Sequence, residues 1–497
     1  MTKKSRASRS PSFFNRASLP AMAAAMVAGG VLTAAALTTG VARPNFDSVT
    51  FQQLDLFGEV FEQVHENYVT SPDDKELIEG AIDGMLSSLD PHSSYLTFDD
   101  FERMQEQTRG SFAGLGIHVT QETEGAGRGL VKVISPIDET PAARAGLQPG
   151  DLIYEIDGES VFGMTLDDAI SLMKGPKGTS VDIKLIREDE PEPFDYTIVR
   201  DIVTVSPVNA RLEEGGIGYV RLTGFTAQTE RKMREALRDL KEENGADLRG
   251  VVLDMRNNPG GLLDQAVGVS NAFLDGGEIV STKGRRTKDS MREVGEPGQL
   301  VEGVPIVVLV NSGSASASEI VAGALQDRNR ALLLGTKTFG KGSVQTVLPL
   351  QNGMNGALRL TTARYYTPSG RSIQAQGIVP DIVMPITRPG EDEPVKRRRE
   401  ADLKGALDVP EGSEEAPEIQ AEVIEEDTGP TSAQQILLDG QASLKKEERD
   451  KENATALFVE PTECPLEQDC QLDRALELLR DRTSYAQLLA DAGDIER

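Results

Sequence analysis

The chain has 497 residues, enough for about three domains with sizeable hydrophobic cores. Its 80 acidic and 52 basic residues give a formal charge of −28, which argues against a nucleic-acid-binding protein because phosphates would be repelled. The 2 cysteines lie close to acidic residues in the C-terminal tail, and the 3 histidines are far apart, so no zinc-ligand spacing can be assembled. We therefore expect no metal and no cofactor, and we expect any nucleophile to be a hydroxyl.

The N-terminus has the pattern of an export signal. Lysines and arginines among the first 16 residues precede an uncharged run, 17–42, that is rich in Ala, Gly, Val and Leu. Residues 1–42 are predicted to be either a cleaved signal peptide or an inner-membrane anchor, and the sequence leaves both open. The predicted location is the periplasm or cell envelope. There, Cys464 and Cys470 could form a disulfide or remain as free thiols.

The segment 43–109 is predicted to be helical. Apolar residues recur at helical spacing on two faces, which indicates amphipathic helices that pack against other parts of the protein. The first face comprises Leu56, Val60, Phe61 and Val64, and the second comprises Leu77, Ile78, Ile82 and Leu86.

Three further regions follow, and they give a mixed α/β (α+β) fold class. Residues 110–190 alternate short β-branched runs with Gly and Pro turns, which predicts a small β-rich domain with two short helices. Residues 191–387 alternate strands with helices, as in a layered α/β core. Residues 388–497 begin with an acidic linker, and the later part is predicted either to dock back as helices or to mediate assembly.

The small β-rich domain contains four motif pieces in a fixed order. Gly114-Leu115-Gly116-Ile117 precedes a strand, and Pro141–Leu147, Pro149–Ile153 and Ile156–Gly158 follow. In this order the pieces resemble a PDZ domain. Glycines beside Leu115 allow backbone N–H groups to converge on a terminal carboxylate, while the next strand pairs with the peptide. Leu115, Gly116 and Ile117 are therefore the candidate peptide-binding residues, with a preference for apolar tails. The alternative is a tight turn that needs glycine only for positive φ.

Two segments of the α/β core suggest hydrolytic chemistry. Asn311–Ile320 contains four alternating serines and joins a buried strand to a helix, where a nucleophile could lie beside backbone donors; a simple N-cap is the alternative. Thr338–Gln345 places Lys341 between glycines, where burial would favour a neutral amine that can act as a general base.

The same lysine segment partly matches the motif of a nucleotide-binding P-loop. Residues 335–341 match G-x-x-x-x-G-K, but Gly342 stands where a P-loop needs Ser or Thr to ligate magnesium. The residues that follow are β-branched and predict a strand, whereas a P-loop opens a helix. Nucleotide binding is therefore not expected.

Together these motifs resemble the carboxy-terminal processing peptidases, or tail-specific proteases, of serine peptidase family S41. The resemblance covers about residues 51–386 and includes Leu89–Ser93, Leu253–Leu262, the serine and lysine segments, and Tyr366–Asp381. It implies an α/β serine peptidase core with an embedded PDZ domain and helical N- and C-terminal segments. By this resemblance the nucleophile is Ser316, the base is Lys341, and Gln345 holds the lysine amine.

The resemblance also implies acyl transfer from Ser316 to water, with Lys341 moving the proton. The oxyanion would be bound by the N–H of Ala317 and by that of Gly260 or Gly261, of which we take Gly261. Asp327 matches an acidic family position but is equally explained as a salt-bridge partner. Lys174 stands where relatives often carry Arg, and lysine cannot make the bidentate guanidinium contact that such an arginine would make.

The preferred function is an exported serine endopeptidase that captures apolar C-termini through its PDZ domain and cleaves with a Ser316/Lys341 dyad. The expected partners are protein substrates, with an adaptor or a second copy of the chain as further partners. The alternative is a non-catalytic PDZ adaptor. That adaptor should lack the serine, the lysine or the oxyanion glycine, and the sequence contains all three.

Overall fold

The structure is a computed structural model that describes residues 48–187, 190, 192–387, 389, 397–410, 456–459 and 462–493. The chain divides into two compact units, residues 1–78 and 79–497, which we describe separately. The predicted signal or anchor, 1–42, lies outside the described residues. Within the described part of the chain, no helix combines the length and apolar composition that crossing a bilayer requires.

In the first unit, helix α2 (Ser48–Asn67) confirms the predicted helix but not the predicted packing of its apolar face. None of its residues is buried, and Leu56 and Val60 are both about half exposed. The spacing of apolar residues predicts an amphipathic helix, but it does not predict which surface, if any, packs against the apolar face. Helix α3 (Asp74–Ser87) follows and continues into the second unit. Leu86 is the one residue of its predicted apolar face that is buried.

A seven-stranded sheet forms the centre of the second unit, in the order β10-β11-β12-β15-β16-β19-β21. From β11 onward the pairs are parallel, and β10 joins the edge antiparallel. The strands are β10 (Val208–Glu213), β11 (Ile217–Leu222), β12 (Gly250–Asp254), β15 (Ile306–Val310), β16 (Leu332–Gly335), β19 (Ile382–Val383) and β21 (Leu457–Phe458).

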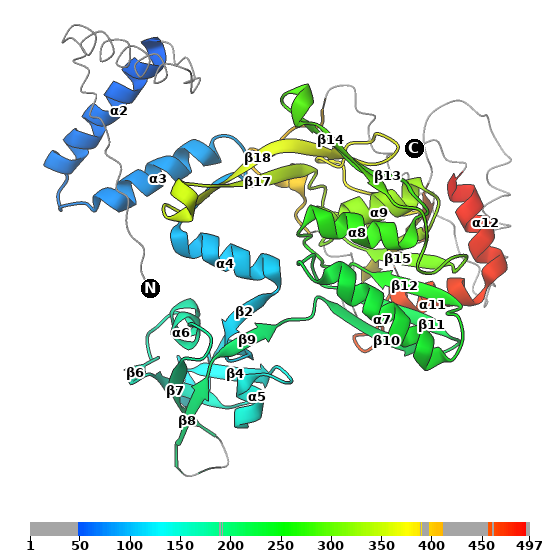
Figure 1. Cartoon of the computed structure of the whole chain (residues 1–497), viewed down its shortest axis with the longest axis horizontal. Coiled ribbons are helices and arrows are strands. Elements are labelled where there is room, and N and C mark those ends of the chain that lie inside the picture. Colours follow the sequence, from blue (N-terminus) through cyan, green and yellow to red (C-terminus); the bar gives the residue numbers. More distant parts are fainter. Residues whose placement is uncertain are drawn as a thin grey trace, which may run out of the picture. The chain divides into compact units, whose positions relative to one another are not determined.

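Helices cover both faces of this sheet (Figure 1). Alternate strand residues enter two separate cores, as expected for strands buried on both faces. Val251 and Leu253 pack with α7 (Thr229–Asn244), α8 (Leu263–Phe273) and α9 (Ala317–Asp327), whereas Val252 packs with α11 (Cys470–Arg480) and α12 (Arg482–Gly493). The C-terminal helices therefore dock back on the core, an outcome that the sequence left open.

A second, mostly antiparallel sheet lies beside the site segments. It has the order β1-β18-β13-β14, and β17 pairs with β18. Strand β17 follows the lysine segment directly, which confirms the strand predicted there and excludes the helix that a P-loop would open. The strands are β1 (Ser94–Leu96), β13 (Gly277–Gly284), β14 (Met291–Gly295), β17 (Ser343–Pro349) and β18 (Ala357–Tyr366).

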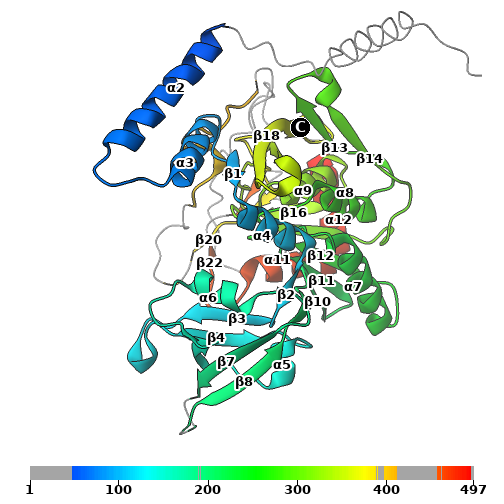
Figure 2. The ribbon, with the colours of Figure 1, turned by 60° about the vertical axis from the view of Figure 1, so that its left-hand side comes forward.

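The small domain is a sheet of order β3-β4-β5-β7-β8, with β6 paired to β5 (Figure 2). It includes two short helices, as predicted: α5 (Pro141–Ala145) and α6 (Leu166–Met173). The strands are β3 (Ile117–Gln121), β4 (Val131–Pro136), β5 (Leu152–Ile156), β6 (Glu159–Ser160), β7 (Ser180–Ile186) and β8 (Phe194–Val199).

Strand β8 corrects the predicted domain boundary at 190/191, because it pairs with β7 as the last strand of the small sheet. The acidic, proline-containing sequence between the two strands looks like a linker, yet it joins neighbouring strands of one sheet. The domain connects to the rest of the chain through β2 (Ser111–Gly114) and β9 (Asp201–Thr204), which pair with each other. Helix α4 (Phe98–Arg109) precedes β2.

The tail adds β20 (Ile386–Thr387), which pairs with β22 (Thr462–Glu463) ahead of α11. Cys464 and Cys470 form a disulfide, which was one of the two states that the sequence allowed. The described residues 397–410 include a short 3-10 turn, η4 (Glu400–Asp402), whose contacts with the core are described below.

Candidate active site

Ser316 lies at the turn between β15 and α9, in a strained conformation. Its φ of 56° and ψ of −112° are unusual for a residue other than glycine, and such strain is typical of functional sites. Its neighbours Ser314 and Ser318 are fully buried, and their hydroxyls donate to Met255 O (2.8 Å) and Asn258 O (2.9 Å). Two of the alternating serines therefore hold the turn against the glycine loop, and Ser316 alone among these three is partly accessible.

Glu319 joins the serine segment to the lysine segment. One carboxylate oxygen, Oε2, accepts from the N–H of Ser316 (2.7 Å) and the N–H of Lys341 (2.9 Å). The other, Oε1, accepts from Thr338 Oγ1 (2.6 Å) and from the N–H of Gly340 (2.7 Å). Complete burial raises the pKa of Glu319 to about 7, while these hydrogen bonds act in the opposite direction. The two predicted residues, Ser316 and Lys341, thus donate their backbone N–H groups to one carboxylate.

Lys341 lies on a closely packed loop. A Cβ on Gly342 would lie 2.1 Å from Gln374 N, so only glycine allows this approach. Burial, together with the nearby Arg359 guanidinium, lowers the pKa of Lys341, which increases the fraction of neutral amine near neutral pH. A partly desolvated lysine of this kind suits a general base.

Gln345 follows this loop on β17, but it forms its hydrogen bonds with residues other than Lys341. Its amide nitrogen donates to Ser343 Oγ (2.9 Å) and to Thr361 Oγ1 (3.3 Å). No hydrogen bond between Gln345 and Lys341 occurs among the described residues. The strand register shifts between Val344 and Gln345. A local irregularity of this kind is what Gln345 would need in order to lie beside Lys341.

The glycine loop after β12 lies against the serine turn. A Cβ on Gly260 would lie 2.9 Å from Ser316 Cβ and 2.9 Å from Ala317 N, so this position requires glycine. The Gly260 N–H is already bonded to Asn258 Oδ1 (2.9 Å), whereas the described hydrogen bonds include none from the Gly261 N–H. Ala317 is the first residue of α9, so its N–H lacks an intrahelical acceptor. Gly260 thus provides the close approach, and Gly261 and Ala317 are the candidate donors.

Asp254 and Arg256 hold the base of this loop. Asp254 is fully buried at the end of β12 and accepts from Tyr219 Oη (2.8 Å) and from Arg256 Nη2 (2.6 Å). Arg256 also donates to both carboxylate oxygens of Asp469, at 2.7 and 2.6 Å, which links the loop to the start of α11. Burial alone would lower the pKa of Arg256, but the two carboxylates raise it, so the cation persists.

Asp327 has the structural environment that the salt-bridge interpretation predicts. It lies at the end of α9, pairs with Arg371 and accepts from Ser369 N (2.9 Å). Although burial raises the pKa of Asp327, the Arg371 guanidinium and the hydrogen bonds lower it overall. Lys174, at the end of α6, pairs with Glu106 Oε2 (2.8 Å) and lies 5.3 Å from the centre of the Phe112 ring.

The predicted peptide-binding loop precedes β3, an edge strand of the small sheet. Leu115 O accepts from Ala142 N (2.9 Å), and Gly116 O accepts from Ile137 N (2.9 Å). Because a trans peptide directs its N–H opposite to its C=O, the N–H groups of Gly116 and Ile117 point away from these partners. Leu115 itself is buried in the core of the domain. Paired N–H groups beside a strand edge suit a terminal carboxylate and an added strand.

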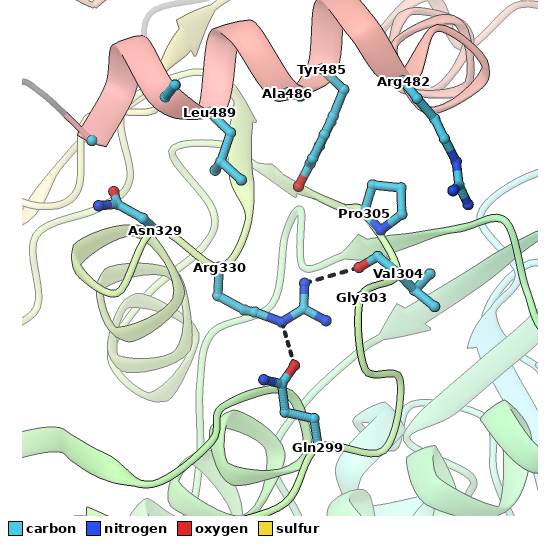
Figure 3. A pocket seen from close by; sticks show the side chains of 12 residues that line it. Gln299, Gly303, Val304, Pro305, Asn329, Arg330, Arg482, Tyr485, Ala486 and Leu489 are labelled. Atoms are coloured by element: carbon cyan, nitrogen blue, oxygen red, sulfur yellow. Dashed lines mark hydrogen bonds between the residues drawn. The ribbon is translucent and has the colours of Figure 1, made fainter.

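A cavity of about 760 Å³ lies elsewhere, beneath α12 (Figure 3). Arg330 points into it, but its guanidinium already donates to the carbonyls of Phe273, Val304 and Val301 and to Gln299 Oε1. The cation is therefore satisfied by the protein itself. None of the predicted site residues lines this cavity.

Sequence reasoning missed the connecting residues of the site. Glu319 had a usable signal, because Ser316-x-x-Glu319 is a capping-box spacing at the start of a helix. His92 lies in the motif Leu89–Ser93, but nothing local in the sequence pairs it with Glu400, or Glu400 with Gln374, since these residues meet only in three dimensions.

Comparisons with known proteins identify relatives of this chain. The chain matches Peptidase family S41 over residues 216–384, a PDZ domain over 132–187, and the N-terminal domain of the activating protease CtpB over 32–99. The carboxy-terminal-processing protease of Bartonella bacilliformis is 46% identical over 455 residues, covering 91% of this chain and 94% of that protein. The carboxy-terminal processing protease CtpA of Bacillus subtilis is 35% identical over 332 residues, covering 66% and 68%.

Among solved structures, the photosystem II D1 C-terminal processing protease is 32% identical, with a TM-score of 0.39, and the match covers 68% of this chain and 93% of that one. The mixed α/β class with an embedded PDZ domain is confirmed. The extent and identity of the curated matches settle the family: the chain belongs to peptidase family S41 and is a carboxy-terminal processing serine protease with a PDZ domain.

Proposed function

We propose that this protease is an exported endopeptidase that captures apolar C-termini through its PDZ domain and cleaves with Ser316 and Lys341. The observation that carries the proposal is the Glu319 carboxylate, whose Oε2 accepts from the backbone N–H groups of both residues. A strained serine at a helix start and a partly buried lysine are thereby held on one support.

In the proposed reaction, neutral Lys341 takes the proton of Ser316 Oγ as the oxygen attacks the peptide carbonyl. The N–H groups of Ala317 and Gly261 bind the developing oxyanion. The lysine then gives its proton to the leaving amine, which leaves an acyl-serine. A water loses its proton to Lys341 and attacks the acyl group, and Lys341 returns that proton to Ser316 Oγ as the acyl–oxygen bond breaks. Gln345 keeps the role of a proposed partner of the lysine.

Capture of the substrate is assigned to the edge of β3 and the loop before it. The N–H groups of Gly116 and Ile117 would receive the terminal carboxylate, and β3 would pair with the tail. Export rests on the basic and then uncharged sequence of residues 1–42, and it places the enzyme in the periplasm or cell envelope, free or anchored.

The test uses an unstructured protein with an apolar C-terminus and the chain from residue 43 onward. Ser316→Ala and Lys341→Ala should each lose cleavage by at least about 10³-fold, while still binding the tail. An otherwise identical substrate whose C-terminus is amidated should be cleaved poorly, because the carboxylate is lost. Normal cleavage by Ser316→Ala would refute the site, and tail binding without any cleavage by the wild-type enzyme would favour the adaptor alternative.

A further inference from the structure

The described segment 397–410 contacts the lysine loop, although it lies beyond the S41 match, which ends at residue 384. Glu400, the first residue of η4, is only 1% exposed. Its N–H donates to Phe339 O (3.1 Å), two residues before Lys341. A tail residue is therefore attached to the backbone of the loop that carries the candidate base.

The Glu400 side chain reaches the other side of the same loop through one intermediary. Gln374 Nε2 donates to Glu400 Oε1 (3.0 Å), and Gln374 Oε1 accepts from the Gly342 N–H (3.1 Å). Gln374 is fully buried, and Gly342 packs directly against its backbone. The loop is thus held at Phe339 and at Gly342, on either side of Lys341.

The Glu400 carboxylate also pairs with His92. The imidazole Nε2 lies 2.9 Å from Oε1 and 2.8 Å from Oε2. The backbone of His92 is also fixed, because its backbone N–H donates to Asp90 Oδ1 (2.8 Å) and its backbone carbonyl accepts from Arg359 Nε (3.2 Å). A buried carboxylate with this many partners has one defined position.

Charged groups surround the Lys341 amine from several elements. Arg359 on β18 disfavours the protonated amine, whereas Glu400, Glu319 on α9 and Asp90 before β1 favour it. Glu400 is the largest of the acidic contributions and reaches the loop from the tail.

We propose that Glu400, paired with His92, is a positioning residue that fixes the Lys341 loop and faces the lysine amine with a negative charge. The segment around residue 400 is then part of the active site, although it lies beyond the S41 match, which ends at residue 384. This inference rests on the proposed Ser316 and Lys341 mechanism.

The test compares Glu400→Gln with Asp408→Asn, which changes an exposed carboxylate in the same segment. Both are made in the chain from residue 43 and assayed for kcat, KM and the pH profile of kcat/KM on the apolar-tailed substrate. We expect Glu400→Gln to lower kcat at least about tenfold with KM changed less than about twofold. The acid limb of its profile should move to lower pH, because a protonated lysine loses a stabilising negative charge. Asp408→Asn should match the wild type.

Glu400→Asp provides the second variant, because it keeps the charge and shortens the side chain. Its acid limb should return toward the wild-type position even if kcat stays low, which a merely structural defect would not produce. An unmoved acid limb in Glu400→Gln, or a shift that Glu400→Asp does not reverse, overturns the proposal. If Ser316→Ala or Lys341→Ala remains active, the proposed function fails instead; if both are inactive while Glu400→Gln matches Asp408→Asn, only the Glu400 assignment fails.

Discussion

Glu319 is the residue on which the two halves of the candidate site depend. It receives four hydrogen bonds, from Ser316, Thr338, Gly340 and Lys341, and it is completely buried. All four partners present an N–H or O–H donor, so both oxygens must act as acceptors. The requirement for two acceptor oxygens follows from the positions of these four donors, and not from the charge of the carboxylate alone.

Replacing Glu319 with Gln tests that requirement. The amide NH₂ would face two donors, and leaving buried donors unsatisfied costs about 1–3 kcal/mol each, so we expect a loss of about 2–6 kcal/mol in the free energy of unfolding. Cleavage should fall at least about 10²-fold, because both site segments lose their support. Urea unfolding and the cleavage assay measure the two effects. Glu243→Gln, on the exposed face of α7, is the control and should leave both unchanged.

The pH dependence of cleavage follows from Lys341. Burial and then Arg359 lower the pKa of this lysine, and the neutral amine is the proposed active form, so activity should rise with pH along an acid limb below the ordinary lysine value of 10.5. Arg359→Gln removes a positive charge that disfavours protonation. Its acid limb should therefore move to higher pH, opposite to that of Glu400→Gln. A shift of both variants in the same direction would contradict this account of the lysine.

At the scale of elements, the site is built where the turn after β15 meets the glycine loop after β12. Parallel neighbouring strands bring their carboxyl ends to the same edge of the sheet, which is where α/β proteins place their functional residues. Ser314 and Ser318 fasten the turn, and Gly260 allows the loop to approach Ser316. The close packing of these two loops sets the position of the candidate oxyanion donors.

Gly260→Ala tests this packing. The position has a φ of 96°, and a Cβ would lie 2.7 Å from Ala315 O. Cleavage should fall at least about 10²-fold as the loop is displaced, together with a strain cost of about 1–3 kcal/mol. Gly245→Ala is a matched control, because its φ is also positive, 67°, but nothing lies within 4 Å of the added Cβ. Equal loss of cleavage in both variants would show that backbone strain, rather than contact with Ser316, is responsible.

At the scale of the whole second unit, the tail completes the core. Helices α11 and α12 cover one face of the central sheet, and Asp469 connects α11 to Arg256 at the base of the glycine loop. The carboxylate of Asp469 also accepts from Leu472 N (3.1 Å) as the N-cap of α11. One side chain thus joins the tail, the sheet and the site loop.

Asp469→Ala should therefore destabilise the protein. Loss of the N-cap and of the Arg256 partner is expected to lower the free energy of unfolding by about 2–4 kcal/mol. Cleavage should also decrease, because Arg256 would lose one of its two carboxylates. Asp473→Ala, an exposed change in the first turn of the same helix, should have little effect. Thermal or urea unfolding of the two variants compares them; equal stability would show that the tail contributes no more than its apolar packing.

The sequence predicted those features that local patterns encode. The segment Asn311–Ile320 indicated the end of β15 and the start of α9, and the β-branched residues after Lys341 indicated β17. Together with Gly342, that strand argued against a P-loop. The sequence did not predict that β8 extends the small sheet past residue 190, since the sequence between β7 and β8 has the composition of a linker. It also did not predict the exposed apolar face of α2, because amphipathic spacing does not identify a partner.

For the site, the sequence by itself determined the kinds of residue and their local conformations: a serine at a helix start, a lysine between glycines and a loop that requires glycine. The tertiary structure decided how they are connected. Glu319 joins Ser316 to Lys341, and His92 meets Glu400 across 308 positions of the chain. Such contacts depend on which surfaces pack together, and packing of distant segments leaves no periodic signal in the sequence. The local patterns are set by backbone geometry within a few residues, whereas the connections of the site are set by the fold.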